Sequence, residues 1–334
     1  MSAATAAILF AGVILYATFG GADFGAGFWD LTAGGPERGR RPRELVDHAI
    51  GPVWEANHVW LIFCLVVLWT GFPPAFAAIM TTLYIPLGLA ALGIVLRGSG
   101  FAFRKVVARL SEKRASGVVF ASSSVITPFF FGAVAGGIAS GRVPDNGGGD
   151  ALASWLNPTS MLGGILAVVA CAYLAAVFLT AEARTRGEPD LERWFRRRAV
   201  GAAAVAGGLA AGGVFVLHAD SRHLFDELID PARGLPLLVI SGGAGLSTLV
   251  LLGRADPRVL RVLAAGAVAS VVAGWGVAQY PYLLGTHLRI AEAAAPEATL
   301  WSLVLVLAGG ALLLAPSFVL LYMLQQRGRL ENLG

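Results

Sequence analysis

Apolar and polar residues follow one another in long blocks along this chain. About nine blocks are apolar over roughly the 20 residues that a helix needs to cross the hydrocarbon core of a bilayer. Short polar segments rich in arginine separate these blocks. The pattern predicts an all-α polytopic membrane protein with about nine transmembrane helices, near residues 3–24, 53–72, 75–97, 116–138, 159–181, 199–217, 235–253, 259–279 and 300–323. No polar segment is long enough for a separate soluble domain, so residues 1–334 are expected to form a single transmembrane domain.

The composition excludes a soluble globular protein. Hydrophobic residues make up 56% of the 334 residues and charged residues only 14%, and the mean hydropathy is +0.71. A soluble domain could not keep that much apolar surface from water. The chain is basic, with a pI near 9.4. Its basic residues lie in short segments between predicted helices and not on one folded surface, so we expect no nucleic-acid partner.

Positive charge is distributed unevenly between the two ends of the predicted helices. If the helices alternate in direction, the segments after the first, third, fifth and seventh helices share one side with the C-terminus. These segments hold all but four of the 25 Lys and Arg residues. Because cytoplasmic segments carry the excess of Lys and Arg in membrane proteins, the N-terminus is expected outside and the C-terminus in the cytoplasm. The opposite side keeps Arg142, Arg222, Arg233 and Arg289.

Two acidic residues fall inside predicted spans, where ionisable groups are costly and usually serve ion or proton movement. Asp23 lies near the cytoplasmic end of the first predicted helix, and Glu55 near the cytoplasmic start of the second. Glu55 and His58 are three residues apart on one helix and therefore share a face, with Trp54 and Asn57 beside them. This placement predicts a proton relay at one cytoplasmic entrance.

Two alternatives to that relay remain open. Glu55 could pair with a loop arginine, either Arg97 or Arg104, and only fix the position of its helix. The chain could also be a proton-coupled secondary transporter, with Asp23, Glu55 and His58 binding the coupling ion near the membrane midplane. That class predicts symmetric broken helices in two halves and function without a partner, and we detect no symmetry between the halves.

Candidate metal ligands are sparse. His58 is the one histidine inside a predicted span, whereas bis-histidine haem ligation needs a pair, so we do not expect this chain to ligate haem by itself. Cys64 and Cys171 lie in apolar spans without the CxxC or Cys/His spacing of a metal site, and both are expected to be small core residues. The sequence predicts no metal site.

Several motifs, dispersed in order over most of the chain, resemble subunit II of the cytochrome bd quinol oxidases. They are GGADFGAGFWDL (20–31), GPVWEANHVWLIF (51–63), the Phe72-Pro73 helix end, RGSGFAFR (97–104) and QYPYL (279–283). The resemblance implies two four-helix bundles plus one peripheral helix. It implies a complex in the bacterial cytoplasmic (inner) membrane that oxidises quinol, reduces dioxygen to water and takes its protons from the cytoplasm.

The family also implies the partners and cofactors of this chain. A larger subunit I would hold haem b and haem d, with none ligated by this chain, and small single-helix accessory subunits and a bound structural quinone are compatible with the family. A third alternative is that subunit II only anchors subunit I structurally.

By position in the motifs, Asp23 and Glu55 match family acids associated with a proton path, so the resemblance assigns these two residues to that path. The helical spacing adds His58, which shares a face with Glu55. The supporting residues would be Trp54, Asn57, Trp60, Arg97 and Arg104. The sequence departs from the family pattern at three places. Glu55 stands where many members have aspartate, His58 where many have glutamate or glutamine, and Ala102 where the RGxxFxFR segment carries an acid.

Overall fold

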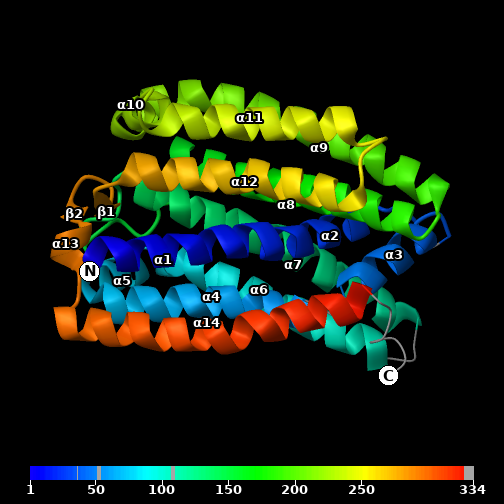
Figure 1. Ribbon diagram of the computed structural model, residues 1–334, viewed down its shortest axis with the longest axis horizontal. Helices are drawn as coiled ribbons and strands as arrows, with labels where there is room; N and C mark the ends of the chain where they lie inside the picture. The colour runs from blue at the N-terminus through cyan, green and yellow to red at the C-terminus, as the bar shows by residue number, and fades with distance from the viewer. Residues whose placement is uncertain (36, 51–53, 107–109, 327–334) are drawn as a thin grey trace.

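The computed structural model describes the backbone of residues 1–35, 37–50, 54–106 and 110–326. Within these ranges it does not describe the side chains of residues 50, 54–56, 101, 104–106, 110–115, 315, 318, 321, 322 and 324–326. Long helices run side by side along the longest axis of the molecule (Figure 1). The described part is almost entirely helical, which confirms the predicted all-α class.

The first span is longer than predicted. It comprises α1 (Ser2–Leu15), the π-helical turn η1 (Tyr16–Gly20) and α2 (Gly21–Leu31), which together form one apolar stretch of 30 residues. The predicted end near residue 24 was wrong because tertiary contacts stabilise the last turns of α2. Trp29 Nε1 donates a 2.8 Å hydrogen bond to the carbonyl of Ala172, and Asp30 forms a 2.8 Å ion pair with Arg43 of α3 (Arg40–Ile50). Asp23 therefore lies about two turns inside the span and not near its end.

The second span ends in a sharp bend. Helix α4 (Trp54–Gly71) and the short α5 (Pro73–Thr82) meet at 118°, with Phe72 between them. A residue before proline is disfavoured in a helix, and proline at the first helical position favours a new start. The predicted third span, 75–97, was wrong in both limits, because α5 is separate and α6 runs from Tyr84 to Val106.

The remaining predicted spans are confirmed as helices, most of them longer than predicted. They are α7 (Leu110–Ala139), α8 (Pro158–Thr185), α9 (Pro189–Asp220), α11 (Gly234–Leu251), α12 (Pro257–Gln279) and α14 (Glu297–Gln326). Short elements join them: α10 (Arg222–Ile229), α13 (Ile290–Ala293) and an antiparallel pair of strands, β1 (Tyr282–Leu284) and β2 (Leu288–Arg289).

Within the described residues, seven helical stretches are long and apolar enough to cross a membrane, and the bent α4–α5 pair is an eighth candidate. Helix α6 contributes a shorter apolar stretch, Tyr84–Gly100. The count of about nine spans, the division into two bundles and one peripheral helix, and the orientation in the membrane stay predictions.

The ends of the helices form two groups. The N-terminus, α5, α10, the β1–β2 pair and α13 lie at one end of the molecule, and α3 and the last turn of α14 lie at the other (Figure 1). This arrangement agrees with the alternation used to divide the arginines between two sides.

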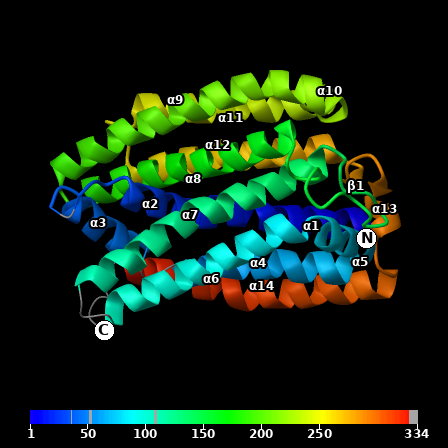
Figure 2. The same ribbon diagram turned by 180° about the vertical axis from the view of Figure 1, so that it is seen from behind.

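Helix α8 lies at the centre of the larger apolar core, packed against α2, α7, α9 and α12 (Figure 2). Four consecutive α8 side chains, Leu174 to Val177, are fully buried. By contrast, Leu312 and Val306 of α14 are 77% and 72% exposed. Apolar surface of this extent requires lipid or a partner subunit to cover it.

Asp220 at the end of α9 joins three segments. It accepts hydrogen bonds from Arg142 Nη2 (2.6 Å), in the α7–α8 connection, and from Thr159 Oγ1 (2.6 Å), at the start of α8.

We expect Asp220→Asn to lower the free energy of unfolding by about 1–3 kcal/mol, because hydrogen bonds to a charged group are lost. Thermal unfolding of the purified protein measures this change. Asp226→Asn is the control, since the Asp226–Arg222 pair is more than half exposed and its loss is expected to cost under about 0.5 kcal/mol. Equal losses in the two variants would contradict the joining role.

Candidate functional site

Asp23 of α2 and Arg97 of α6 form a buried ion pair. The Asp23 residue is 4% exposed and Arg97 is fully buried. Arg97 Nη2 donates to Asp23 Oδ1 at 2.8 Å and to the Asp23 backbone carbonyl at 3.0 Å. The prediction that Arg97 is a loop residue was wrong, because α6 continues for more than two turns beyond it. Since a buried arginine needs a compensating charge, Asp23 provides the physical reason why Arg97 can lie inside the protein.

The rest of the Arg97 guanidinium is enclosed by α2 and α7. Its Nη1 atom donates a hydrogen bond to Ser124 Oγ, and its central carbon lies 4.9 Å from the ring centre of Phe24 and 4.4 Å from that of Phe120. Aromatic faces attract cations at such distances, most strongly where water is excluded. We call Asp23, Arg97, Ser124, Phe24 and Phe120 the Asp23 cluster.

Two glycines of the GGADFGAG motif allow α2 to approach its neighbours. A Cβ atom on Gly27 would overlap Ser124 Oγ and lie 3.0 Å from Arg97 Nη1, and a Cβ on Gly25 would overlap the backbone carbonyl of Cys171 in α8. The glycine spacing therefore has a steric cause: it leaves room for the Asp23 cluster on one side of α2 and for α8 on another.

Helix α4 places Asn57 and His58 beside this cluster. Asn57 is buried, and its Nδ2 donates to the Phe19 carbonyl at 3.4 Å. Phe19 belongs to η1, and π-helical turns, which disturb the regular backbone pattern, often lie at functional sites. The His58 ring lies 6.0 Å from that of Phe24 and 6.3 Å from that of Tyr16. Phe24 therefore contacts both His58 and Arg97.

Four of the predicted site residues thus come together: Asp23, Asn57, His58 and Arg97. Trp60 lies on α4 with its ring 6.1 Å from Phe63. The side chains of Trp54, Glu55 and Arg104 lie outside the described part of the structure, although the backbone of all three belongs to α4 or α6. A pairing of Glu55 with Arg97 or Arg104 therefore stays a prediction.

Sequence reasoning missed Ser124, Phe24 and Phe120. The run of three serines at 122–124, inside an otherwise apolar span, was a usable signal. Polar side chains in a membrane helix usually face a neighbouring helix and form hydrogen bonds there. Ser124 does so, since it contacts Arg97 and also donates to the Phe120 carbonyl at 2.6 Å. The positions of Phe24 and Phe120 carried no comparable signal, because aromatic residues are common throughout the spans.

The family model of cytochrome bd terminal oxidase subunit II matches residues 1–325. This chain belongs to that family. Family membership and the long apolar helices make it an integral membrane protein. Among the described residues, no group of three or more His, Cys, Asp or Glu side chains could hold a metal ion, and the assignment of the haems to subunit I rests on the family alone.

Individual members of the cytochrome bd subunit II family are similar over parts of their length. The cytochrome bd ubiquinol oxidase subunit 2 of Bacillus subtilis (strain 168) is 30% identical over 198 residues, which cover 58% of this chain and 55% of that protein. The cytochrome bd-I ubiquinol oxidase subunit 2 of Escherichia coli (strain K12) is 27% identical over 237 residues, 66% of this chain and 59% of that protein. The aligned regions thus span less than two thirds of these relatives.

A solved structure agrees over nearly the whole chain. A chain in the structure of bd oxidase from Geobacillus thermodenitrificans matches with a TM-score of 0.78 and 26% identity, covering 97% of this chain and 98% of that one. This match confirms that the helices are arranged as in a bd oxidase subunit.

Proposed function

We propose that this chain acts as subunit II of a quinol-oxidising cytochrome bd complex in the bacterial cytoplasmic membrane. A larger subunit I would be its partner, with quinol and dioxygen as substrates. The family match over residues 1–325 and the fold shared with a bd oxidase support this assignment. Haem b and haem d, held by subunit I, would supply the electron transfer and the oxygen chemistry. Small accessory subunits and a bound structural quinone stay predictions.

Within that complex, we propose that Asp23, Glu55 and His58 carry protons towards the site of oxygen reduction. The observation behind this role is the asymmetry of the Asp23 carboxylate. Arg97 holds Oδ1, whereas Oδ2 is buried and accepts no hydrogen bond from the described residues. An acid oriented through one oxygen, with the other open, can take up a proton without losing its position. Buried ionisable groups inside a membrane protein are most often functional.

The contacts of Arg97 allow the proton to be released again. When Oδ2 is protonated, the charge attraction to Arg97 is lost, but Arg97 still donates to the Asp23 carbonyl and to Ser124. The guanidinium therefore stays in place and can pair with the carboxylate again once the proton has left. We assign His58, beside Phe24, to the same path, and Glu55 lies three residues before it on α4.

The experiment is oxygen consumption by the purified complex with Asp23→Asn or Glu55→Gln. We expect both variants to assemble with a normal haem spectrum and to consume oxygen about a hundredfold more slowly than the wild type, which is the low end for loss of a proton-transfer group. Asp23→Glu keeps a carboxylate and should retain part of the rate. Asp150→Asn is the control, because Asp150 lies in the exposed α7–α8 connection.

Two outcomes would overturn the proton role. Wild-type turnover in both variants with an intact haem spectrum would remove Asp23 and Glu55 from the path. A rate that falls only in proportion to the amount of assembled complex would favour the structural-anchor alternative. The transporter alternative has lost support, because the family match is to an oxidase subunit over nearly the whole chain.

A further inference from the structure

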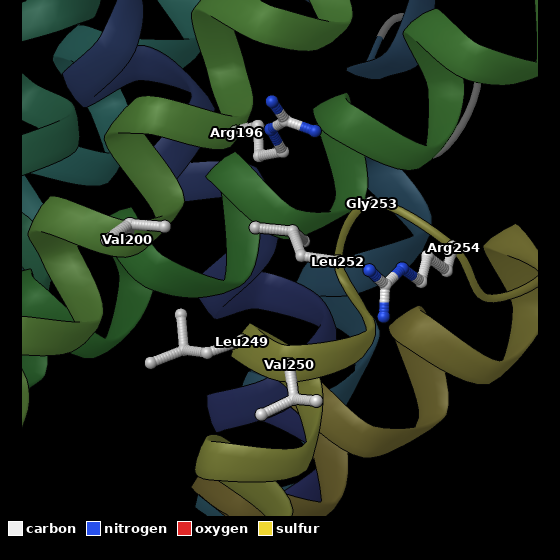
Figure 3. A pocket seen from close by; sticks show the side chains of 7 residues that line it. All are labelled: Arg196, Val200, Leu249, Val250, Leu252, Gly253 and Arg254. Carbon is white, nitrogen blue, oxygen red and sulfur yellow. The ribbon is translucent and has the colours of Figure 1, made fainter.

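A shallow cavity of about 320 Å³ lies between α9 and α11, at the end of the molecule where α3 lies (Figure 3). Two arginines, Arg196 of α9 and Arg254 of the α11–α12 connection, line it on one side, and the aliphatic side chains of Val200, Leu249 and Val250 lie on the other. The cavity is therefore amphiphilic, with cationic groups and hydrocarbon walls in one small space.

The two arginines differ from most others at this end of the molecule, because the side chain of neither forms an ion pair or a hydrogen bond with the described residues. Neighbouring arginines are neutralised by carboxylates: the pairs are Arg184–Glu192, Arg186–Glu182, Arg193–Asp190 and Arg261–Glu182. Arg196 is held close to the backbone of the α11–α12 connection, since a Cβ on Gly253 would lie 3.1 Å from its Nη1. The cavity thus keeps two guanidinium groups available for an anion.

The aliphatic walls indicate what kind of anion fits. Val250 is 64% exposed and Val200 is 47% exposed, and both belong to helices long and apolar enough to span a membrane. A soluble anion would satisfy the arginines and leave these side chains uncovered. A phospholipid would satisfy both, because its phosphate would bind guanidinium groups while its acyl chains cover the exposed valines.

We propose that this α9–α11 cavity binds the phosphate headgroup of an anionic phospholipid. The predicted orientation, with the arginine-rich ends of the helices in the cytoplasm, would put the cavity in the cytoplasmic leaflet, where each Lys or Arg near the surface adds to the attraction for anionic lipid. The proposal is independent of quinol oxidation, since it rests on the two arginines and the apolar walls alone.

The test measures phospholipid binding to the purified complex in mild detergent by native mass spectrometry, with phosphatidylglycerol as the probe. In the double variant Arg196→Gln/Arg254→Gln we expect phosphatidylglycerol to bind about tenfold more weakly than in the wild type. The matched control is Arg197→Gln/Arg258→Gln, which removes the same charge from two exposed arginines nearby that do not line the cavity. The control should bind as the wild type does.

Two further arms separate lipid from simple charge effects. Phosphatidylcholine, which has no net charge, should bind equally to all three proteins, and inorganic phosphate should not compete with phosphatidylglycerol at equal concentration. Equal losses in the two double variants would overturn the proposal in favour of non-specific charge attraction. Competition by inorganic phosphate would also overturn it, because the site would then recognise the phosphate group without the lipid.

Discussion

Arg97→Met is expected to prevent stable assembly of the complex. The substitution leaves the Asp23 carboxylate buried without its cation, and breaking one partner of a buried ion pair costs about 3–5 kcal/mol. It also removes the donor to Ser124 and the cation between Phe24 and Phe120. The yield of haem-containing complex after mild-detergent purification, together with its thermal unfolding temperature, measures the loss.

A double variant separates the structural role of the pair from its role in proton transfer. Asp23→Leu/Arg97→Met removes both charges, and replacing a buried pair by apolar residues of similar volume is often neutral for stability. We expect this variant to assemble again while oxygen consumption stays low. Normal assembly of Arg97→Met alone would contradict the buried-pair interpretation. Normal turnover of the double variant would show that protons reach the oxygen site without Asp23.

Gly25→Ala is expected to have the second largest effect. A Cβ at this position would overlap the Cys171 carbonyl, which is backbone and cannot rotate away. Helix α2 would have to move away from α8, and the Trp29–Ala172 hydrogen bond would be strained. Overpacking of this kind costs about 1–3 kcal/mol, which is a large part of the stability of most proteins. Thermal unfolding of the purified complex measures the effect.

Gly243→Ala is the matched control for Gly25→Ala. Gly243 also lies inside a long apolar helix, α11, but a Cβ there would meet nothing within 4 Å. Because alanine favours a helix over glycine by up to about 1 kcal/mol, this variant should be as stable as the wild type or slightly more stable. If Gly25→Ala proved equally harmless, the close approach of α2 and α8 would not depend on glycine.

The fold class could be predicted from the sequence because it depends on the length of the apolar blocks and on the charged segments between them. Both can be read from neighbouring residues in the chain. Each predicted apolar block became a helical span except the third, which is divided between α5 and α6. The bend at Phe72-Pro73 was visible as a helix end in the sequence, but its 118° angle depends on how α5 packs against the core. The first span continues beyond residue 24 because Trp29 and Asp30 find partners on α8 and α3, which no local pattern can show.

The sequence predicted several residues of the candidate site, but not the contacts between them. Asp23 and Arg97 were both selected, but as an entrance acid and a loop arginine. Their pairing across 74 positions of sequence depends on the arrangement of α2 and α6. A charged residue nine positions before the end of a helix looks like a loop residue when hydropathy alone sets the boundary. Burial of the opposite charge on another helix makes the longer helix stable, and only the tertiary structure contains that information.

The position of Arg97 inside α6 also has a consequence for the biogenesis of the protein. An arginine raises the free energy of membrane insertion by about 2.5–3.5 kcal/mol at the centre of a helix and by less near its ends, and the apolar part of α6, Tyr84–Gly100, is shorter than those of most other spans. Helix α6 is therefore poorly suited to enter the bilayer by itself. Helix α2, which carries Asp23, leaves the ribosome before α6. Asp23 can therefore already be in the membrane when Arg97 enters it, and the ion pair can form as α6 inserts.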